Sequence, residues 1–382
     1  MTSSTPLFSR RTFNSLLTGA AVLGAPAFLR AQSKQRIVLG QSAAFTGPAA
    51  QLGIQFHAGA KLFFDQLNAK GGVDGTTIEI KKLDDGYEPD RCAENTSKLL
   101  SEEVFALFGY IGTPTSVAAL PLATKAETLF FAPFTGAMGL REPFNRFAFH
   151  MRASYNDETA LIVRQLTNLG LKRIAVFYQN DAYGKAGLSG VNLALQAQGL
   201  KPVATATVER NSVEVDKAVE IINAAKPHAV VQISAYSSCA AYIKAARKTG
   251  FGGSFFNVSF VGAQALSDAL GAEGAGVAIS QVMPSPYKAS RPITRELLSA
   301  IAADGNKVQA NYSSMEGYMA AKLFAEGLRR ATARTPAGLS AGLESIRNWS
   351  MGGFNVSFTP TNHVASNFAE LSMITAGGKI HT

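Results

Sequence analysis

The sequence predicts an α/β protein with two doubly wound parallel-sheet lobes. Short β-rich runs alternate with amphipathic helical segments almost throughout the chain, and this alternation is typical of parallel sheets covered by helices. The alternation of strands and helices begins again after Asn156-Asp157, a pair suited to capping a helix. About 350 residues remain once an N-terminal export segment is set aside, and a single core stops growing at about 250 to 300 residues. Two lobes are therefore expected.

The first sheet is predicted between Arg36 and Met151. Its strands are expected at Arg36 to Gly40, Thr76 to Leu83, Phe105 to Ile111, Leu129 to Phe134 and Phe147 to Met151. Its helices are expected from Leu52 to Lys70, Asp90 to Ser101 and Pro114 to Glu127. Gly71-Gly72 ends the first of these helices, because glycine is favoured just past a helix end.

The second sheet is predicted from the same alternation after residue 156. Its strands are expected at Arg173 to Tyr178, Val203 to Val208, Ala229 to Ser234, Phe255 to Ser259 and Gly276 to Val282. Helices are expected to end at Leu169 and Gln198, and to span Glu214 to Ala225 and Ser237 to Lys248. Pro284 and Pro286 indicate a return crossing, because proline ends regular structure. Three helices follow between Pro292 and Arg347, and Phe354 to Phe358 is expected to cross again.

The N-terminal segment is predicted to be an export signal. Arg10-Arg11 precede the mostly apolar run Leu16 to Ala27, and a paired arginine ahead of such a run is typical of the twin-arginine route. The run has twelve residues, whereas a membrane span needs about 20. We expect the signal to cover residues 1–31 and to be cleaved after Ala31, with Ala27 as a second possible site. An amphipathic first helix is disfavoured, because no acidic residue precedes Asp65.

Charge and hydropathy exclude two classes of partner. Without Arg10, Arg11 and Arg30 the chain carries 33 basic and 27 acidic side chains, a balance of +6. No window clusters lysine and arginine as nucleic-acid binding demands. No other stretch approaches eighteen apolar residues, so the mature form is expected to have no membrane span. We expect an exported monomer that binds no nucleic acid.

One strand end carries the features of an anion site. The strand ending at Ile111 runs through Gly112 into Thr113, Pro114, Thr115 and Ser116. Threonine suits the N-cap and proline suits the first helical position, where its missing N–H costs nothing. The amides of the first turn, the helix dipole and the three hydroxyls together predict a carboxylate site. An ordinary, well-capped helix is the competing interpretation.

Aromatic residues follow the strands on both sides of the expected cleft, because ligands of open α/β sheets bind beyond the carboxyl ends of the strands. Tyr183, Tyr236 and Phe260 each come just past a strand of the second sheet. Phe134-Thr135 and Leu52 hold equivalent positions in the first. Such a wall buries an apolar ligand body while its hydroxyls fix orientation. Each aromatic taken alone fits a core or surface position better than a ligand contact.

Catalysis has no support in the sequence. There is no Gly-x-Ser-x-Gly elbow, no phosphate loop, no dinucleotide fingerprint and no His-Glu-x-x-His. The five histidines are scattered without metal-ligand spacing, and we predict no metal and no cofactor. Asp84-Asp85 resembles a carboxylate pair, but a turn before Gly86 explains it more simply. An exported hydrolase with Ser116 or Thr113 as nucleophile lacks an evident base.

Nearly all of the mature chain resembles the leucine/isoleucine/valine-binding branch of the solute-binding proteins of ABC importers. The resemblance rests on these motifs: Thr46-Gly47-Pro48 with Gly53, Asn68-Ala69-Lys70-Gly71-Gly72-Val73-Asp74-Gly75, Asp84-Asp85, and Tyr183-Gly184. It implies a type I periplasmic binding fold, in which two lobes joined by three crossings close by hinge motion. The implied N-terminal lobe is 32–152 plus 283–350, and the C-terminal lobe is 153–282 plus 351–382.

The resemblance also implies site residues. The family's hydroxyl anchor for a ligand carboxylate falls on Thr113. Its second anchor loop falls on Phe134, Thr135 and Gly136, with the hydroxyl offset by one place. The second-lobe aromatic contacts fall on Tyr183 and Tyr236. The family's occasional cysteine pair falls on Tyr87 and Gly112, so that disulfide is not expected, and Arg152 falls near the first crossing.

One departure from the family affects the ligand. Amino-acid binders of this type hold the ammonium with an acid after the strand expected at Phe255 to Ser259, and this chain has Ser259-Phe260-Val261 there. A buried ammonium without a partner costs several kcal/mol. We therefore expect a small carboxylate with an aromatic or branched apolar body rather than a free amino acid. Glu316 is a residue that could restore ammonium binding.

The predicted function is that of a non-enzymatic periplasmic binding component that delivers its ligand to an ABC permease and ATPase complex. Two alternatives remain open within the same fold. The closed form could instead dock on a membrane sensor, or the chain could be a true branched-chain amino acid binder.

Overall fold

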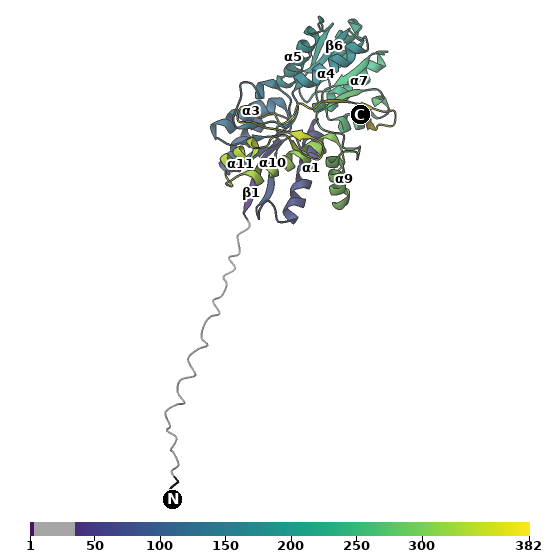
Figure 1. Ribbon diagram of the computed structural model, residues 1–382. Coiled ribbons are helices and arrows are strands. Elements are labelled where there is room, and N and C mark those ends of the chain that lie inside the picture. Colours follow the sequence, from purple (N-terminus) through teal and green to yellow (C-terminus); the bar gives the residue numbers. More distant parts are fainter. Residues whose placement is uncertain (4–34) are drawn as a thin grey trace. The chain divides into compact units, whose positions relative to one another are not determined.

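Two sheets with the same order of parallel strands organise residues 35–382 of the computed structural model (Figure 1). The structure describes residues 1–3 and 35–382. The expected twin-arginine motif and cleavage site lie outside the described residues. No helix in the described part is both long and apolar enough to cross a membrane.

The first sheet has the order β2-β1-β3-β4-β5, and all its strands are parallel. The strands are β1 (Arg36–Ala43), β2 (Thr77–Asp84), β3 (Ala106–Phe108), β4 (Phe130–Phe131) and β5 (Ala148–Phe149). The helices of this half are α1 (Ala50–Ala69), α2 (Pro89–Ser101), α3 (Thr113–Lys125), α9 (Pro292–Ala303), α10 (Tyr312–Arg330) and α11 (Pro336–Glu344). A 3-10 turn, η1 (Met138–Leu140), lies between β4 and β5.

The second sheet has the order β14-β13-β10-β9-β8-β6-β7. Its strands are β6 (Ile174–Gln179), β7 (Thr205–Val208), β8 (Ala229–Ile233), β9 (Ser254–Asn257), β10 (Ala278–Gln281), β13 (Glu370–Ile374) and β14 (Ile380–His381). Its helices are α4 (Tyr155–Asn168), α5 (Ala182–Gln196), α6 (Asp216–Ala224), α7 (Tyr236–Lys248) and α8 (Ala263–Leu270), with 3-10 turns η2 (Ser259–Val261) and η3 (Gly271–Gly274). The parallel part, β7-β6-β8-β9-β10, repeats the order of the first sheet.

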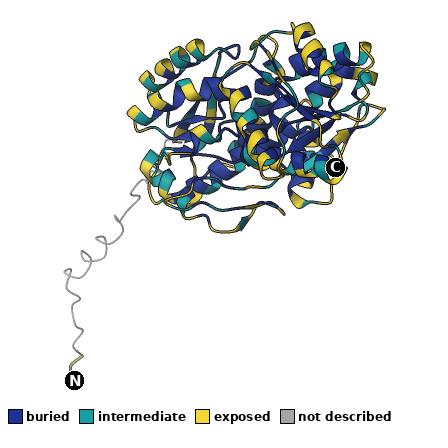
Figure 2. Cartoon of the chain, turned by 90° about the horizontal axis from the view of Figure 1, so that it is seen from above, coloured by how far each residue is buried: buried dark blue, intermediate teal, exposed yellow. Residues whose placement is uncertain are grey.

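This architecture confirms the predicted fold class and adds two antiparallel strands. β13 pairs antiparallel with β10, and β14 pairs antiparallel with β13. Both lie in the last thirteen residues, where the sequence pattern predicts no strand. Buried residues fill the interior of each half, and exposed residues line the outward faces of the helices (Figure 2).

The last crossing between the sheets comes later than expected. A small hairpin pairs β11 (Trp349–Ser350) with β12 (Asn355–Val356). Phe358 then packs edge-on against Phe149 of β5, with ring centroids 5.3 Å apart. The His150 amide donates to the His363 carbonyl at 2.8 Å. Residues 354–365 therefore stay with the first sheet, because these contacts bind them to β5, and the chain joins the second sheet at β13.

Helices α1 and α10 approach closely at two glycines. A Cβ at Gly59 would collide with the carbonyl oxygen of Ser314, and a Cβ at Gly317 would collide with that of Phe56. Helix α10 is buried along nearly its whole length. The absence of two side chains thus lets a central helix pack directly on α1.

Replacing Gly59 with alanine should therefore lower the free energy of unfolding by about 1–3 kcal/mol, because overpacking forces the helices apart. The midpoint of urea unfolding measures this change. Gly252→Ala is the matched control, since a Cβ there meets no atom within 4 Å. Equal midpoints for the two variants would contradict the close packing.

Candidate ligand-binding site

The start of helix α3 is held beside the end of β4. A parallel bridge joins Ile111 to Phe134 beyond the last regular pairing of β3 and β4, and the Gly112 amide donates to the Phe134 carbonyl at 3.3 Å. Gly112 has φ +100°, and a Cβ there would collide with the ring of Tyr87. Glycine is thus required at the turn that delivers Thr113 to the first position of α3.

Two predicted hydroxyls meet at this point. Thr113 and Thr135 are both buried, and their Oγ1 atoms are 2.6 Å apart. The Ala137 amide donates to Thr135 Oγ1 at 3.2 Å, which holds the loop of residues 133–137 in place; we call this segment the anchor loop. The Thr135 hydroxyl, which is offset by one position from the family's anchor, therefore does reach Thr113.

The remaining residues of the predicted anion site are Pro114, Thr115 and Ser116, and only the Ser116 hydroxyl is left without a partner among the described residues. The helix begins one residue earlier than predicted, because Gly112 rather than Thr113 is the N-cap and no side chain caps the helix; Pro114 still stands in the first turn. The Thr115 hydroxyl donates to the carbonyls of Ile111 and Gly112 at 2.5 and 3.0 Å, so its hydrogen is committed to its own turn. The Ser116 hydroxyl is buried and has no hydrogen-bond partner among the described residues.

Aromatic rings from both halves surround Phe260. Its ring centroid lies 5.8 Å from that of Phe134, 5.8 Å from Tyr87 and 4.5 Å from Tyr183. All four residues are buried. Phe134 and Tyr87 belong to the first half, whereas Tyr183 and Phe260 belong to the second. The sequence-predicted aromatic residues Phe134, Tyr183 and Phe260 are brought together, and Tyr87 joins them.

Leu52 and Tyr236 lie at the edge of this cluster. A Cβ added to Gly262, just past Phe260, would lie 2.5 Å from Leu52 Cδ2, so Leu52 packs against that turn. Tyr236 is half-buried, and burial raises its pKa while the Gln51 amide opposes the change. Both residues therefore contribute to contacts between the start of α1 and the second half.

A buried ion pair lies beneath the rings. Arg152 Nε and Nη2 donate to the two carboxylate oxygens of Glu316 at 2.8 and 2.7 Å. Both side chains are at most 3% exposed. The Arg152 guanidinium also lies over the ring of Phe134 at 4.0 Å, and its Nη1 donates to Ser259 Oγ at 3.1 Å. Arg152 thus joins α10, the anchor loop and the end of β9.

A second buried carboxylate continues the network. Glu158 accepts hydrogen bonds from the Ser259 amide at 2.7 Å, from Ser259 Oγ at 3.0 Å and from Ser280 Oγ at 2.5 Å. Burial raises its pKa, and the charge of Arg152 opposes the rise. Glu316 and Glu158 are therefore both already engaged by groups of the protein.

Further hydrogen bonds join the two halves along the rim of the site. Glu88 of the first half accepts from Arg210 at 2.6 Å and from Asn211 at 2.7 Å. Gln179 donates to the Tyr87 hydroxyl at 3.3 Å. These contacts join the two halves.

The Asp84-Asp85 pair does not act as a unit. Despite its partial burial, hydrogen bonds from Thr46 and Phe45 lower the pKa of Asp84 to about 2. Burial raises the pKa of Asp85 to about 6 against the hydrogen bond from Ser42. Each carboxylate has its own structural partners, which supports the turn interpretation. No group of three potential metal ligands occurs among the described residues.

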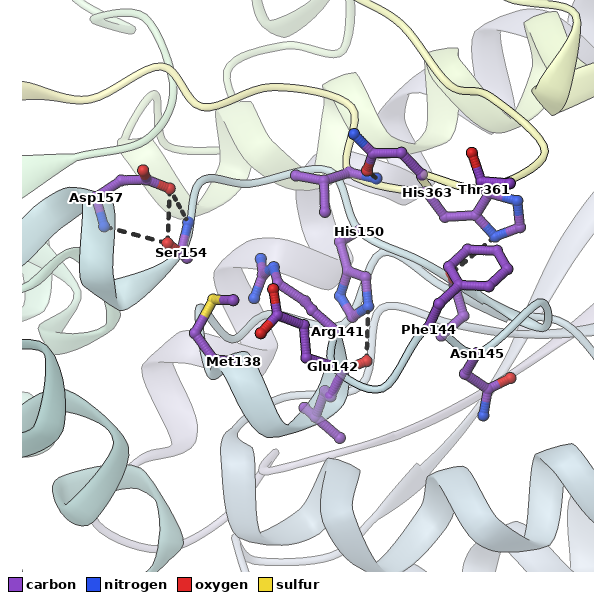
Figure 3. Close-up of a pocket in the computed structure, with 14 residues that line it drawn as sticks. Met138, Arg141, Glu142, Phe144, Asn145, His150, Ser154, Asp157, Thr361 and His363 are labelled. Carbon is purple, nitrogen blue, oxygen red and sulfur yellow. Dashed lines mark hydrogen bonds between the residues drawn. The ribbon is translucent and has the colours of Figure 1, made fainter.

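A separate hollow of about 580 Å³ is lined by residues from the segments 138–157 and 361–364 (Figure 3). Its lining includes Arg141, which is buried and donates to the carbonyls of Thr135, Ala137 and Arg152 at 3.5, 3.2 and 2.9 Å. Arg141 therefore clamps the anchor loop to the first crossing. None of the predicted site residues lines this hollow.

The site and fold place the chain among known proteins. The sequence model of the family described as periplasmic binding protein matches residues 36–379. The chain belongs to the periplasmic binding protein family. This membership confirms the predicted resemblance, and the family's members are substrate-binding proteins.

Curated relatives share its sequence moderately. Leu/Ile/Val-binding protein homolog 7 of Brucella suis is 24% identical over 328 residues, which cover 81% of each chain. An amino acid binding protein of Pseudomonas aeruginosa is 24% identical over 169 residues, and the match spans less than half of either chain, 44% of this one and 45% of that one.

Solved structures share its fold over almost the whole length. A possible leucine/isoleucine/valine-binding protein of Rhodopirellula baltica has a TM-score of 0.85 and 33% identity, covering 90% of this chain and 95% of that chain. A fatty acid ABC transporter substrate-binding protein of Thermomonospora curvata has a TM-score of 0.83 and 21% identity, covering 91% of each. A branched chain amino acid ABC transporter structure of Thermus thermophilus with bound valine has a TM-score of 0.82 and 17% identity, covering 91% and 95%.

Several residues of the site were absent from the sequence prediction. Tyr87 had one signal, since it occupies the family's cysteine position opposite Gly112, and the two residues do touch. Glu158 and Tyr155 lie in the first turn of α4. They were not predicted, because the prediction considered only residues that directly follow a strand. Glu316 was noted, but its pairing with Arg152 had no sequence signal.

Changing Glu316 to glutamine should destabilise the fold by about 3–5 kcal/mol, because it removes the carboxylate that pairs with the buried Arg152 guanidinium at two points. Denaturant unfolding measures this change. The control is Glu79→Gln in the exposed pair with Arg36, where the effect should stay within about 0.5 kcal/mol. The double variant Arg152→Met with Glu316→Leu should recover stability. A Glu316→Gln protein as stable as wild type would contradict the role of the pair.

The raised pKa of Asp85 predicts a pH effect. Between about pH 4 and pH 6 the folded state holds a proton that the unfolded state has lost, so stability falls as pH rises. In Asp85→Asn this loss should disappear. The stability of the variant relative to wild type should thus rise by roughly 2–3 kcal/mol across that range. Parallel stability-against-pH curves would contradict the assignment.

Proposed function

We propose that this chain is the substrate-binding component of an ABC importer that captures a small carboxylate with an aromatic or branched apolar body. The observation that carries the proposal is the Thr113–Thr135 hydroxyl pair at the start of α3, next to the rings around Phe260. Hydroxyls at a helix N-terminus suit an anion, and buried rings suit an apolar body. The protein would act in the periplasm, without catalysis, and hand its ligand to a permease and ATPase complex.

The charges around the site argue against a free amino acid. An α-ammonium needs a counter-charge, and three acids border the aromatic cluster: Glu316, Glu158 and Asp181. Asp181 accepts from the amides of Tyr183 and Gly184 and from Gln179. Glu316 is held by Arg152 in a two-point ion pair, and Glu158 accepts from Ser259 and Ser280. Binding an ammonium would require one of these bonds to break, at a cost that a carboxylate without an amino group avoids.

The relatives favour a second candidate, a branched-chain amino acid. Leu/Ile/Val-binding proteins are among the curated relatives, and one solved structure of the same fold holds valine. Another of the same fold is named for fatty acids. The fold thus accommodates both kinds of acid, and the choice depends on the side chains at the site.

A thermal-shift comparison of benzoate, 4-methyl-2-oxopentanoate and leucine tests the proposal. A ligand at about 100 times its dissociation constant adds roughly 2.7 kcal/mol of stability. We expect at least one of the two acids without an amino group to raise the melting temperature more than leucine does. Stabilisation by leucine alone would contradict the proposal and favour the second candidate.

The anchor is tested with Thr113→Val, which should weaken binding of the stabilising acid about tenfold, the effect of one lost hydrogen bond to a charged group. Thr124→Val, further along the same helix, is the control, since its hydroxyl donates to the Leu120 carbonyl instead. Equal affinities of the two variants would remove Thr113 from the site. Neighbouring genes for a permease and an ATPase would separate import from a sensor role.

A further inference from the structure

Tyr155 stands where the first crossing enters the second half. It is the first residue of α4, whose N-cap Ser154 forms a capping box with Asp157. Its backbone amide donates to the carbonyl of Gly136 in the anchor loop at 2.8 Å. The residue is therefore fixed to the loop that carries Thr135.

The ring of Tyr155 is packed tightly from two sides. A Cβ at Gly136 would lie 2.7 Å from its Cδ1 atom, so only glycine leaves room for the ring there. On the other side its centroid lies 5.4 Å from that of Tyr183. The ring thus fills the space between the anchor loop and the aromatic cluster around Phe260.

The hydroxyl of Tyr155 is buried and has no hydrogen-bond partner among the described residues. Burial raises its pKa, while the charge of Arg152 and the nearby hydroxyls of Thr135 and Thr113 oppose the rise. Those two hydroxyls are close neighbours but are bonded to each other. A buried hydroxyl without a partner costs about 1–3 kcal/mol, and a carboxylate bound beside Thr113 and Thr135 would supply the missing acceptor.

We propose that the Tyr155 hydroxyl is a third donor to the ligand's carboxylate, beside Thr113 and Thr135. This inference rests on the proposed function and extends it. Thr113 and Thr135 belong to the first half, whereas Tyr155 begins a helix of the second. The acid group would then be held by both halves at once, which makes Tyr155 a determinant of specificity for carboxylates and of closure.

Tyr242 provides a matched control within the same chain. Its hydroxyl is also buried without a partner among the described residues, and its ring stacks on Phe177 of β6 at 4.3 Å. It lies within the second half, on α7, away from the Thr113–Thr135 pair. A purely structural tyrosine should behave like Tyr242, and a ligand-binding one should not.

The experiment is calorimetric titration of wild type, Tyr155→Phe and Tyr242→Phe with benzoate, 4-methyl-2-oxopentanoate and the neutral probe benzamide. Tyr155→Phe should lose about tenfold or more in affinity for the acids, because a charge-assisted bond is removed. Any benzamide binding should change far less. Tyr242→Phe should bind like wild type. Without ligand, both variants should be as stable as wild type or more stable, since each removes an unsatisfied hydroxyl.

The outcomes distinguish failure of the Tyr155 proposal from failure of the proposed carboxylate-binding function. Wild-type affinity of Tyr155→Phe for an acid that wild type binds would overturn the inference and leave the proposed function standing. Equal losses in Tyr155→Phe and Tyr242→Phe would also overturn it, because the effect would be structural. If wild type binds neither acid, the proposed function fails and this inference falls with it.

Discussion

The buried guanidinium of Arg152 is the constraint on which the rest of the site depends. A charge removed from water needs a partner and filled hydrogen bonds, and Glu316 supplies the partner from α10, 164 positions along the chain. Ser259 adds a third contact from the end of β9. The pair therefore fixes α10, the first crossing and the second sheet relative to one another. It also engages Glu316, which is then not free to pair with an ammonium ligand.

The groups around that guanidinium join the first crossing to the anchor loop. Arg152 lies over the ring of Phe134, and Arg141 binds carbonyls on both the anchor loop and the crossing. A ligand that touches Thr135 therefore acts on residues already joined to the crossing. Under the proposed function, a ligand that contacts both halves would favour the closed arrangement over the open one.

The sequence predicted the parts of the site that follow from local rules. The start of α3 was located because proline favours the first turn of a helix, although Gly112 and not Thr113 is its N-cap. Phe134, Tyr183 and Phe260 meet because each follows the carboxyl end of a parallel strand. Packing between distant segments could not be read in this way. The pairing of Arg152 with Glu316, the ring of Tyr155 against Gly136 and the late third crossing depend on how far-apart segments meet. The antiparallel strands β13 and β14 were missed because both are short and close to the chain end.

The most direct measurement of the central claim is a crystal structure of the protein with a bound aromatic acid such as benzoate. The account predicts carboxylate oxygens at about 2.5–3.0 Å from the hydroxyls of Thr113 and Thr135, with the ring of the ligand against Phe260. A carboxylate bound elsewhere, for example against Arg141 in the hollow behind the anchor loop, would contradict it.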